Sequence, residues 1–153
     1  MAYGRTGDLG KAREDFAKAL ALAPEDAIIN DNVGSLYVTT AMKSGNVEPA
    51  RQSIPFFEKA LAADPNLASV HNGLAGALRL LGKRDEAIAN WEKAVALDPN
   101  FGMAIYNLAL AYLEKGDKPK ALEYCQKYLQ VRGRNITAEE QREIDALIQK
   151  CRG

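Results

Sequence analysis

The sequence is poor in the residues that build metal centres, disulfide frameworks and acid–base catalysts. Its 153 residues include one histidine, His71, and two cysteines, Cys125 and Cys151. Two cysteines are too few for a disulfide framework, and no Cys/His spacing typical of a metal site surrounds them. His71 has no Ser, Cys or carboxylate at motif spacing that could activate it for catalysis. We therefore expect no enzymatic activity, no metal and no cofactor.

The chain also lacks a net charge and a long hydrophobic run. Its 20 basic and 20 acidic side chains cancel to a formal net charge of +0, so no overall field would attract nucleic acid or an anionic membrane. Residues 1–8 lack the apolar core of a signal peptide, and no segment is long enough to span a bilayer. We expect a soluble protein, with a cytoplasmic location favoured, and neither nucleic acid nor membrane as a partner.

What the sequence does contain is an internal repeat. Residues 60–66 read Ala-Leu-Ala-Ala-Asp-Pro-Asn and residues 94–100 read Ala-Val-Ala-Leu-Asp-Pro-Asn, which places Pro65 and Pro99 34 residues apart. Small and large side chains between the prolines recur at the same period. Leu74, Ala75, Leu78, Gly82, Ala87, Trp91 and Ala94 correspond to Leu108, Ala109, Tyr112, Gly116, Ala121, Cys125 and Tyr128.

This pattern resembles the signature of the tetratricopeptide repeat (TPR), in which each unit of about 34 residues is a helix-turn-helix hairpin. The resemblance implies an all-α fold, a right-handed superhelix of hairpins (an α-solenoid), and a role as a protein–protein interaction scaffold. The apolar spacing supports this implication, because Leu74, Leu78 and Leu81 form one stripe at helical spacing and Ala87, Trp91 and Val95 form another.

The repeat predicts a single domain over residues 1–153. It divides into a half repeat (1–26), a long repeat (27–67), two regular repeats (68–101 and 102–135) and a C-terminal capping helix (136–153). Eight helices are expected over residues 9–22, 28–43, 48–63, 67–81, 84–97, 102–115, 118–131 and 137–150. The last of them begins with the capping-box sequence at Thr137 and carries an apolar stripe of Ile144, Leu147, Ile148 and Cys151.

The long repeat departs from the regular period. Pro24 and Pro65 are 41 residues apart, which is seven more than the regular repeat, and turn-forming residues occupy positions 42–49. We expect each helix of this hairpin to gain about one turn, so that the hairpin projects beyond the edge of the solenoid. Pro55 lies inside the second of these helices and should kink it or delay its start. A length variation without function is the simpler interpretation.

The first unit consists of a second helix only. Tyr3, Gly7, Ala12, Phe16, Ala19 and Pro24 match that half of the pattern. A single TPR helix cannot bury its hydrophobic faces, so Leu9, Phe16 and Leu20 should need a cover. Two alternatives follow: the chain belongs to a longer protein, or a second copy packs there in a homo-oligomer formed through the half repeat.

The resemblance places peptide binding on the concave face, which the first helix of each hairpin lines. The positions that it implies are Asn32, Ser35, Asn72, Arg79, Met103, Tyr106, Asn107 and Leu110. Asn32 and Asn107 occupy the asparagine position typical of the family, where an amide can donate to and accept from a peptide backbone. The middle repeat has Gly73 at this position instead. The alternative is that these asparagines bond only to neighbouring backbone or water.

The character of this face favours a particular ligand. Some TPR domains bind a C-terminal carboxylate through Lys, Asn and Arg, but the matching positions here are Asp31, Ser35, Gly73, Met103 and Asn107, so a chaperone tail is not expected. Small residues at the centre and apolar residues toward Leu110 suit a peptide or helix with aliphatic anchors. His71 is expected to be a packing residue, and both cysteines are expected to be buried small hydrophobes.

Three functions stay open at this stage. The first is a module that binds a peptide or a partner protein in the concave groove. The second is an accessory TPR region of a larger protein, which could itself be an enzyme. The third is a self-assembly module.

Overall fold

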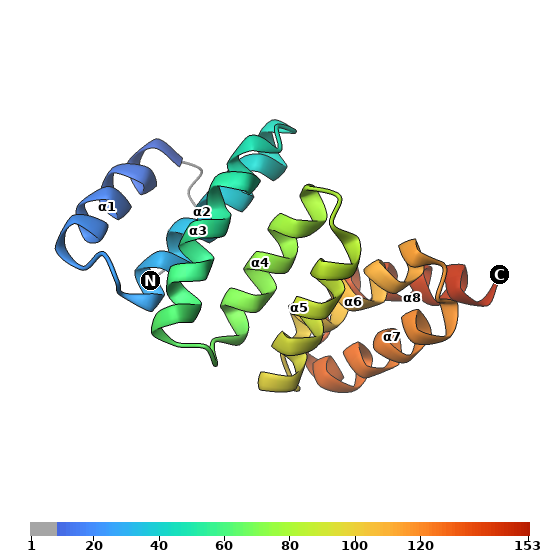
Figure 1. Cartoon of the computed structure of the whole chain (residues 1–153). Coiled ribbons are helices and arrows are strands. Elements are labelled where there is room, and N and C mark those ends of the chain that lie inside the picture. Colours follow the sequence, from blue (N-terminus) through green and yellow to red (C-terminus); the bar gives the residue numbers. More distant parts are fainter. Residues whose placement is uncertain (1–8) are drawn as a thin grey trace.

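A computed structural model describes residues 9–153 as a row of α-helices without any strand in this range. Figure 1 shows the helices stacked side by side as antiparallel hairpins from the N-terminal to the C-terminal end. The elements are α1 (Leu9–Leu22), α2 (Ala27–Ser44), α3 (Glu48–Ala63), α4 (Ala68–Leu80), α5 (Arg84–Leu97), α6 (Gly102–Lys115), α7 (Lys118–Arg132), the 3₁₀ helix η2 (Gly133–Asn135) and α8 (Ala138–Arg152). The predicted all-α solenoid is confirmed, and each predicted helix agrees with its observed bounds to within two residues.

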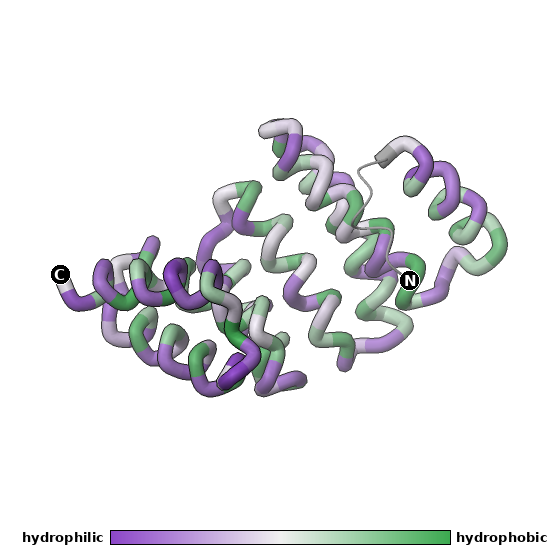
Figure 2. Tube along the Cα trace, turned by 180° about the vertical axis from the view of Figure 1, so that it is seen from behind, coloured by the Kyte–Doolittle hydropathy of each residue, from purple (hydrophilic) through white to green (hydrophobic). Residues whose placement is uncertain are grey.

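The helices are amphipathic and are joined by short turns of defined chemistry. Hydrophilic and hydrophobic residues alternate within each helix in Figure 2, as expected for helices that bury one side. The α4–α5 turn contains Gly82 (φ +78°) and the α6–α7 turn contains Gly116 (φ +84°). Both glycines adopt left-handed backbone angles, which would strain a residue with a Cβ. Within residues 9–153, no helix has both the length and the apolar character that crossing a membrane requires.

The seven extra residues of the long hairpin are divided unequally between its two helices. Helix α2 has 18 residues against 13 in α4, and α3 has 16 against 14 in α5. Helix α2 therefore gains five residues, more than one turn, and α3 gains two, about half a turn. The expectation of one turn in each helix was wrong in detail, but the hairpin does extend beyond its neighbour α4 (Figure 1).

Pro55 does not delay α3, which runs without a break from Glu48 to Ala63. The prediction of a late start was therefore wrong. Pro55 removes the donor for the carbonyl of Arg51, four residues earlier. Both residues lie on the exposed side of the helix, where water can bond to that carbonyl. The cost of the lost hydrogen bond is therefore reduced at this position.

Two clusters of buried side chains hold the stack together. The smaller one surrounds Phe57, which is fully buried between α2, α3 and α4. The larger one surrounds Trp91 and extends from α4 to α8. Alanines fill the helix crossings, and Ala60, Ala75, Ala87 and Ala104 are each 0% exposed. Small side chains at these positions let the helix backbones approach, and the aromatic rings fill the space beside them.

Glu140 fastens the capping helix α8 to α7. The predicted capping box is present, because the Thr137 amide donates to Glu140 Oε2 (2.8 Å) and the Glu140 amide donates to Thr137 Oγ1 (3.2 Å). Arg132 Nη2 donates to Glu140 Oε1 at 2.8 Å, and Tyr128 Oη donates to the same oxygen at 3.2 Å. The Thr137 amide and then Arg132 lower the pKa of Glu140 from 4.5 to about 2.

We expect Glu140→Gln to lower the urea midpoint of unfolding at pH 7. The folded pKa of Glu140 is depressed, so its stabilising effect is complete above the ordinary value of 4.5 and is lost as the pH falls toward about 2. The difference between wild type and Glu140→Gln should therefore shrink between pH 5 and pH 2.5. Glu139→Gln, on the same turn, is the control and should match wild type. A gap between wild type and Glu140→Gln that stays constant with pH would contradict this role.

Helix α1 is the least covered part of the described chain. Phe16 and Leu20 are half-buried against the following hairpin, and Leu22 is 88% exposed. The guanidinium of Arg13 lies 5.9 Å from the centre of the Tyr37 ring. The side chain of Leu9, and Tyr3 and Gly7 of the half-repeat pattern, fall outside the described residues. Association of two copies through this helix stays a prediction.

Candidate functional site

The eight predicted binding residues lie on the first helices of the three hairpins. Asn32 and Ser35 are on α2, Asn72 and Arg79 are on α4, and Met103, Tyr106, Asn107 and Leu110 are on α6. We call this the first-helix surface, and it also includes Asp31, Ser69 and Glu143. Side-chain hydrogen bonds cross it from one helix to the next, among them Ser69 to Asp31, Asn107 to Asn72, and Tyr106 to Glu143 of α8. The four helices therefore present one continuous surface.

Asn72 is tied to the core at the centre of this surface. Its Oδ1 accepts from Trp91 Nε1 at 3.1 Å and from Asn107 Nδ2 at 3.2 Å, which uses both lone pairs of the oxygen. Trp91 is 1% exposed, so its N–H needs a buried acceptor. The amide nitrogen of Asn72 faces Met103 Sδ at 3.6 Å, a weak acceptor. Asn72 is therefore a supporting residue, whose partners are side chains of other helices and not the neighbouring backbone or water of the alternative interpretation.

Asn32 and Asn107 retain polar atoms that a ligand could use. Asn32 is exposed, and its amide bonds to no other residue in the range 9–153. Asn107 uses Nδ2 to bond to Asn72, which orients the amide and leaves Oδ1 without a partner among the described residues. The two amides belong to α2 and α6, on either side of α4. They can serve a backbone that crosses all three helices.

The part of the surface on α6 is more apolar than the part on α2. Met103 is 63% exposed, and Leu110 and Leu113 are half-buried. The Tyr106 ring lies tilted against Tyr128, with ring centres 5.6 Å apart, and Tyr106 Oη donates to Glu143 Oε2 at 3.3 Å. Arg79 forms an exposed ion pair of 3.8 Å with Glu114. The cation of Arg79 is thus already matched by an anion.

Gly73 has a structural role that sequence reasoning missed. A Cβ at Gly73 would lie 2.6 Å from Cε1 of Phe57, and a Cβ at Gly34 would lie 2.7 Å from the same atom. The Phe57 ring therefore fits between α2 and α4 only because both helices carry glycine there. This packing explains why the middle repeat lacks the asparagine of its neighbours. Phe57 lies 16 residues from Gly73 in sequence and on another helix, so no local pattern indicates the contact.

Asp31 also has a role that sequence analysis did not identify, since it entered only as a mismatch to a carboxylate-binding pattern. Ser69 Oγ donates to Asp31 Oδ2 at 2.7 Å across the seam between α2 and α4. Oδ1 of Asp31 is buried and accepts no hydrogen bond from residues 9–153. Burial raises the pKa of Asp31, while the hydroxyls of Ser69 and Ser35 oppose the shift. The sequence holds one indication of this role: residues 19–42 contain no Lys or Arg, so Asp31 has no basic side chain near it along the chain.

The single histidine and both cysteines are buried side chains that pack inside the helical stack. His71 is 9% exposed, and its Nδ1 lies 3.1 Å from Asn90 Oδ1, so the predicted packing role is confirmed. Cys125 (0% exposed) and Cys151 (8% exposed) are free thiols, buried as predicted. Burial, and secondarily Cys151, raise the pKa of Cys125 to about 12, which suppresses its thiolate. Within the described range, no group of three His, Cys, Asp or Glu residues is arranged to hold a metal ion.

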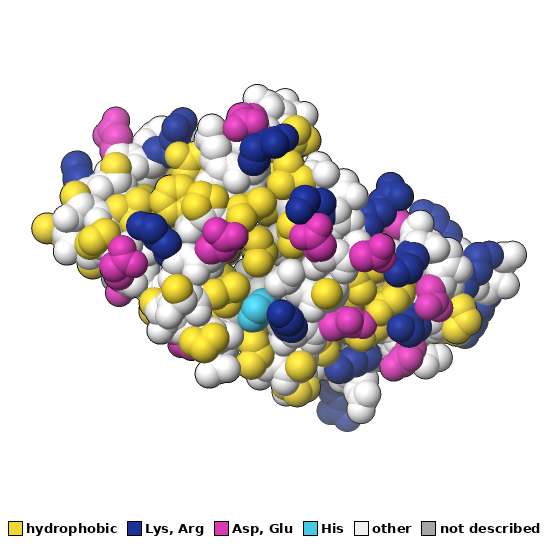
Figure 3. All heavy atoms as spheres, in the orientation of Figure 1, with side chains coloured by type: hydrophobic (Ala, Val, Ile, Leu, Met, Phe, Trp, Pro, Cys, Tyr) yellow, Lys and Arg dark blue, Asp and Glu magenta, His cyan; other side chains and the backbone are white. Residues whose placement is uncertain are grey.

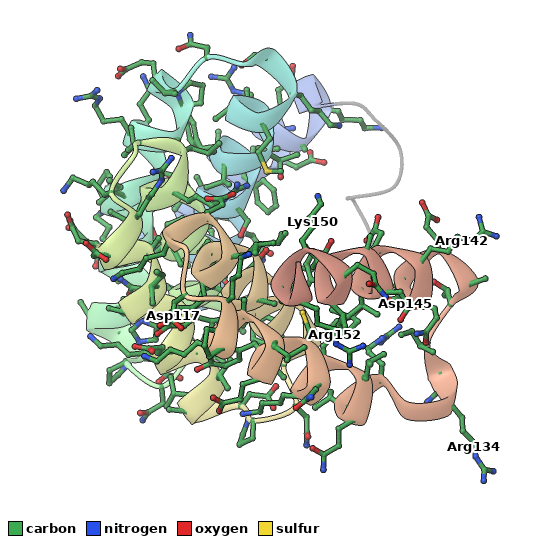
Figure 4. The ribbon with its side chains drawn as sticks, turned by 90° about the vertical axis from the view of Figure 1, so that its right-hand side faces the viewer. Asp117, Arg134, Arg142, Asp145, Lys150 and Arg152 are labelled. Atoms are coloured by element: carbon green, nitrogen blue, oxygen red, sulfur yellow. The ribbon has the colours of Figure 1, made fainter. Side chains whose placement is uncertain are left out.

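The cations of the C-terminal end do not gather into an anion site. Figure 4 shows Arg142 and Lys150 projecting from one edge of α8, while Arg134 points away from them at η2. Acidic residues are interspersed on α8, and Asp145 accepts from Gln141 at 3.0 Å. A phosphate or a nucleic-acid backbone would need several of these cations to converge. Their scatter favours neither ligand.

A small pocket lies between α1, α2 and α3. Its volume is about 110 Å³, and it is lined by Arg13, Leu36, Tyr37, Thr40, Pro49 and Gln52. Small-molecule sites typically measure about 300–1,000 Å³, so this pocket is too small for a cofactor. Figure 3 shows that hydrophobic side chains gather over the part of the molecule formed by α1 to α3. The pocket belongs to this junction between the half repeat and the long hairpin.

Comparison with known proteins identifies the class to which the chain belongs. A family profile described as "TPR repeat" matches residues 76–116, and two profiles described as "Tetratricopeptide repeat" match residues 103–131 and 1–26. The chain is a member of the tetratricopeptide-repeat family, as the 34-residue period predicted. Proteins of this family are typically non-catalytic scaffolds for protein interactions. No curated protein matches the sequence significantly.

Solved structures of TPR proteins have the same fold. A thermophilic TPR protein of Thermus thermophilus superposes with a TM-score of 0.81 at 21% identity, over 94% of this chain and 74% of that one. MamA of MSR-1 gives a TM-score of 0.67 at 27% identity, covering 88% of this chain and 73% of its own. The TPR2B domain of yeast Sti1, in a complex with pHsp70, gives 0.68 at 23% identity, with 81% and 97% covered.

Proposed function

We propose that this protein is an interaction scaffold that binds an extended peptide segment of a partner protein along the first-helix surface. The observation that carries the proposal is the combination of free amides with apolar side chains on one face. Asn32 and Asn107 offer hydrogen-bonding atoms that no residue of the described chain uses. Met103 and Leu110 lie on the same helix as Asn107 and offer apolar contacts. Amides serve a peptide backbone, and apolar side chains anchor its aliphatic residues.

The supporting structure favours a preformed groove. Asn107 is oriented by its bond to Asn72, and Asn72 is held by the buried Trp91. Side chains fixed in this way lose little entropy when a ligand binds. The structure of the similarly folded TPR2B domain of Sti1 was solved in a complex with pHsp70. That complex supports the proposal that a TPR domain of this shape binds a protein ligand.

We expect the double variant Asn32→Ala with Asn107→Ala to weaken peptide binding by about 1–3 kcal/mol, because two backbone hydrogen bonds would be lost. The probes are peptides selected on the wild-type protein from a random phage-displayed library. Affinity is measured by fluorescence polarisation of the labelled peptides.

The matched control is Asn66→Ala with Asn100→Ala. These asparagines lie in exposed turns, and only their backbone amides form hydrogen bonds there. The control should bind the peptides as wild type does, and circular dichroism should show the same helicity for all variants. Selected peptides that bind the first double variant with unchanged affinity would place the binding site elsewhere on the molecule.

A further inference from the structure

Asp31 stands out on the first-helix surface as an incompletely satisfied carboxylate. An ionised carboxylate can accept about four hydrogen bonds. Oδ2 accepts one from Ser69 at 2.7 Å, at the exposed side of the α2–α4 seam. Oδ1 is buried and accepts none from the described part of the chain. Such a group has a remaining capacity for donors that the fold does not fill.

No positive charge of the described chain compensates Asp31. It takes part in none of the ion pairs that the structure contains. Helix α2 has no Lys or Arg before Lys43, at its far end. On the neighbouring helix α4, Arg79 is already paired with Glu114 at 3.8 Å. The nearby groups that face Asp31 are the hydroxyls of Ser35 and Ser69.

Ionised Asp31 opposes folding. Burial raises its pKa above the ordinary value of 3.8, and the hydroxyls of Ser69 and Ser35 only partly offset that shift. When the folded pKa of an acid is raised, stability falls as the pH rises through the interval above the unfolded value. A group that costs stability at neutral pH is typical of a functional position.

We propose that Asp31 binds the cationic side chain of a Lys or Arg residue in the partner's peptide segment. The inference rests on the proposed function and adds to it the chemistry of one ligand position. Asp31 precedes Asn32 in the sequence, so a backbone held by Asn32 passes close to this carboxylate. A cation there would neutralise the charge and donate to the remaining lone pair of Oδ2, at the exposed side of a partly desolvated seam, where charge-assisted bonds are stronger than in open water.

A metal ion is a poorer match for the site. The described residues hold no group of three His, Cys, Asp or Glu side chains, and the neighbours of Asp31 are hydroxyls. Divalent cations are usually held by several carboxylate or carbonyl oxygens. A single ammonium or guanidinium group needs only one carboxylate with free acceptor positions.

The test is a selection of random 12-residue phage-displayed peptides on three immobilised proteins: wild type, Asp31→Asn and Asp31→Lys. Wild type should enrich Lys or Arg at one fixed position of the peptides. Asp31→Asn should lose that enrichment, and Asp31→Lys should enrich Asp or Glu at the same position. A wild-type-selected peptide should bind wild type about tenfold more tightly than its Lys→Met analogue, while Asp31→Asn should bind the two alike.

Folding controls keep the result interpretable. Asn has the shape of Asp and removes the uncompensated charge, so Asp31→Asn should melt no lower than wild type at pH 7. Ser69→Ala removes the donor to Oδ2 but keeps the carboxylate, and it should preserve the basic preference. A loss of the preference in Ser69→Ala as well as in Asp31→Asn would overturn the inference, because it would trace the preference to the seam and not to the charge.

Two further outcomes separate this inference from the proposed function. Peptides without an enriched basic residue that still lose affinity in Asn32→Ala with Asn107→Ala would overturn the role of Asp31 and leave the proposed function standing. A wild-type protein that enriches no peptide above background would overturn the proposed function, and the role of Asp31 with it.

Discussion

Trp91→Ala is expected to lower the free energy of unfolding by about 3–5 kcal/mol, as for other buried aromatic side chains cut back to alanine. The indole is 1% exposed within the cluster that extends from α4 to α8. Its removal leaves a cavity between two hairpins and takes away the N–H that donates to Asn72 at 3.1 Å. Urea unfolding followed by circular dichroism measures the loss, which should propagate to the surface because Asn72 positions Asn107.

Two variants on the same helix separate the components of this effect. Trp91→Phe keeps most of the ring but lacks the N–H, so it should cost less than Trp91→Ala and still loosen Asn72. Leu97→Ala alters a side chain that is 40% exposed at the end of α5, and it should change stability by no more than about 0.5 kcal/mol. If Trp91→Ala lost less than Leu97→Ala, the Trp91 cluster would not be the main core of the stack.

Gly73→Ala is expected to destabilise the protein by about 1–3 kcal/mol, opposite in sign to the usual effect of this substitution in a helix. Replacing glycine by alanine inside a helix normally stabilises it by about 0.5–1 kcal/mol, because alanine loses less backbone entropy. Here the new Cβ would lie 2.6 Å from both Cε1 and Cζ of the buried Phe57 ring. The ring is enclosed by three helices and cannot move away without opening the seam between α2 and α4.

Gly76→Ala is the matched control, one turn further along α4. A Cβ there would lie 3.7 Å from Cγ1 of Val38, an ordinary contact, so this variant should be as stable as wild type or more stable. Phe57→Leu in the Gly73→Ala background should recover part of the loss, because the smaller side chain leaves room for the methyl group. Additive effects of Gly73→Ala and Phe57→Leu in that double-mutant cycle would show that the two residues do not meet.

The amino-acid sequence by itself determined the family, the number of hairpins and the bounds of the helices to within two residues. These features follow from local spacing. An apolar stripe at helical periodicity, a glycine in a left-handed turn and a Thr-x-x-Glu capping box each lie within a few residues of one another. The burial of His71 and Cys125 could be predicted for the same reason, since each occupies a packing position of a repeat, and that of Cys151 because it lies on the apolar stripe of the capping helix.

Only the tertiary structure decided which side chains meet between helices. Phe57 contacts the Gly73 position, Trp91 and Asn107 share the oxygen of Asn72, and Ser69 bonds to Asp31 across 38 residues of sequence. These contacts depend on the rotation and sliding of one helix against the next. The packing of whole side chains sets this rotation and sliding, and the 34-residue period does not specify that packing. The period therefore predicts which helices line the first-helix surface. The unused polar atoms of Asn32 and Asn107, the supporting role of Asn72 and the uncompensated charge of Asp31 depend on how those helices pack together.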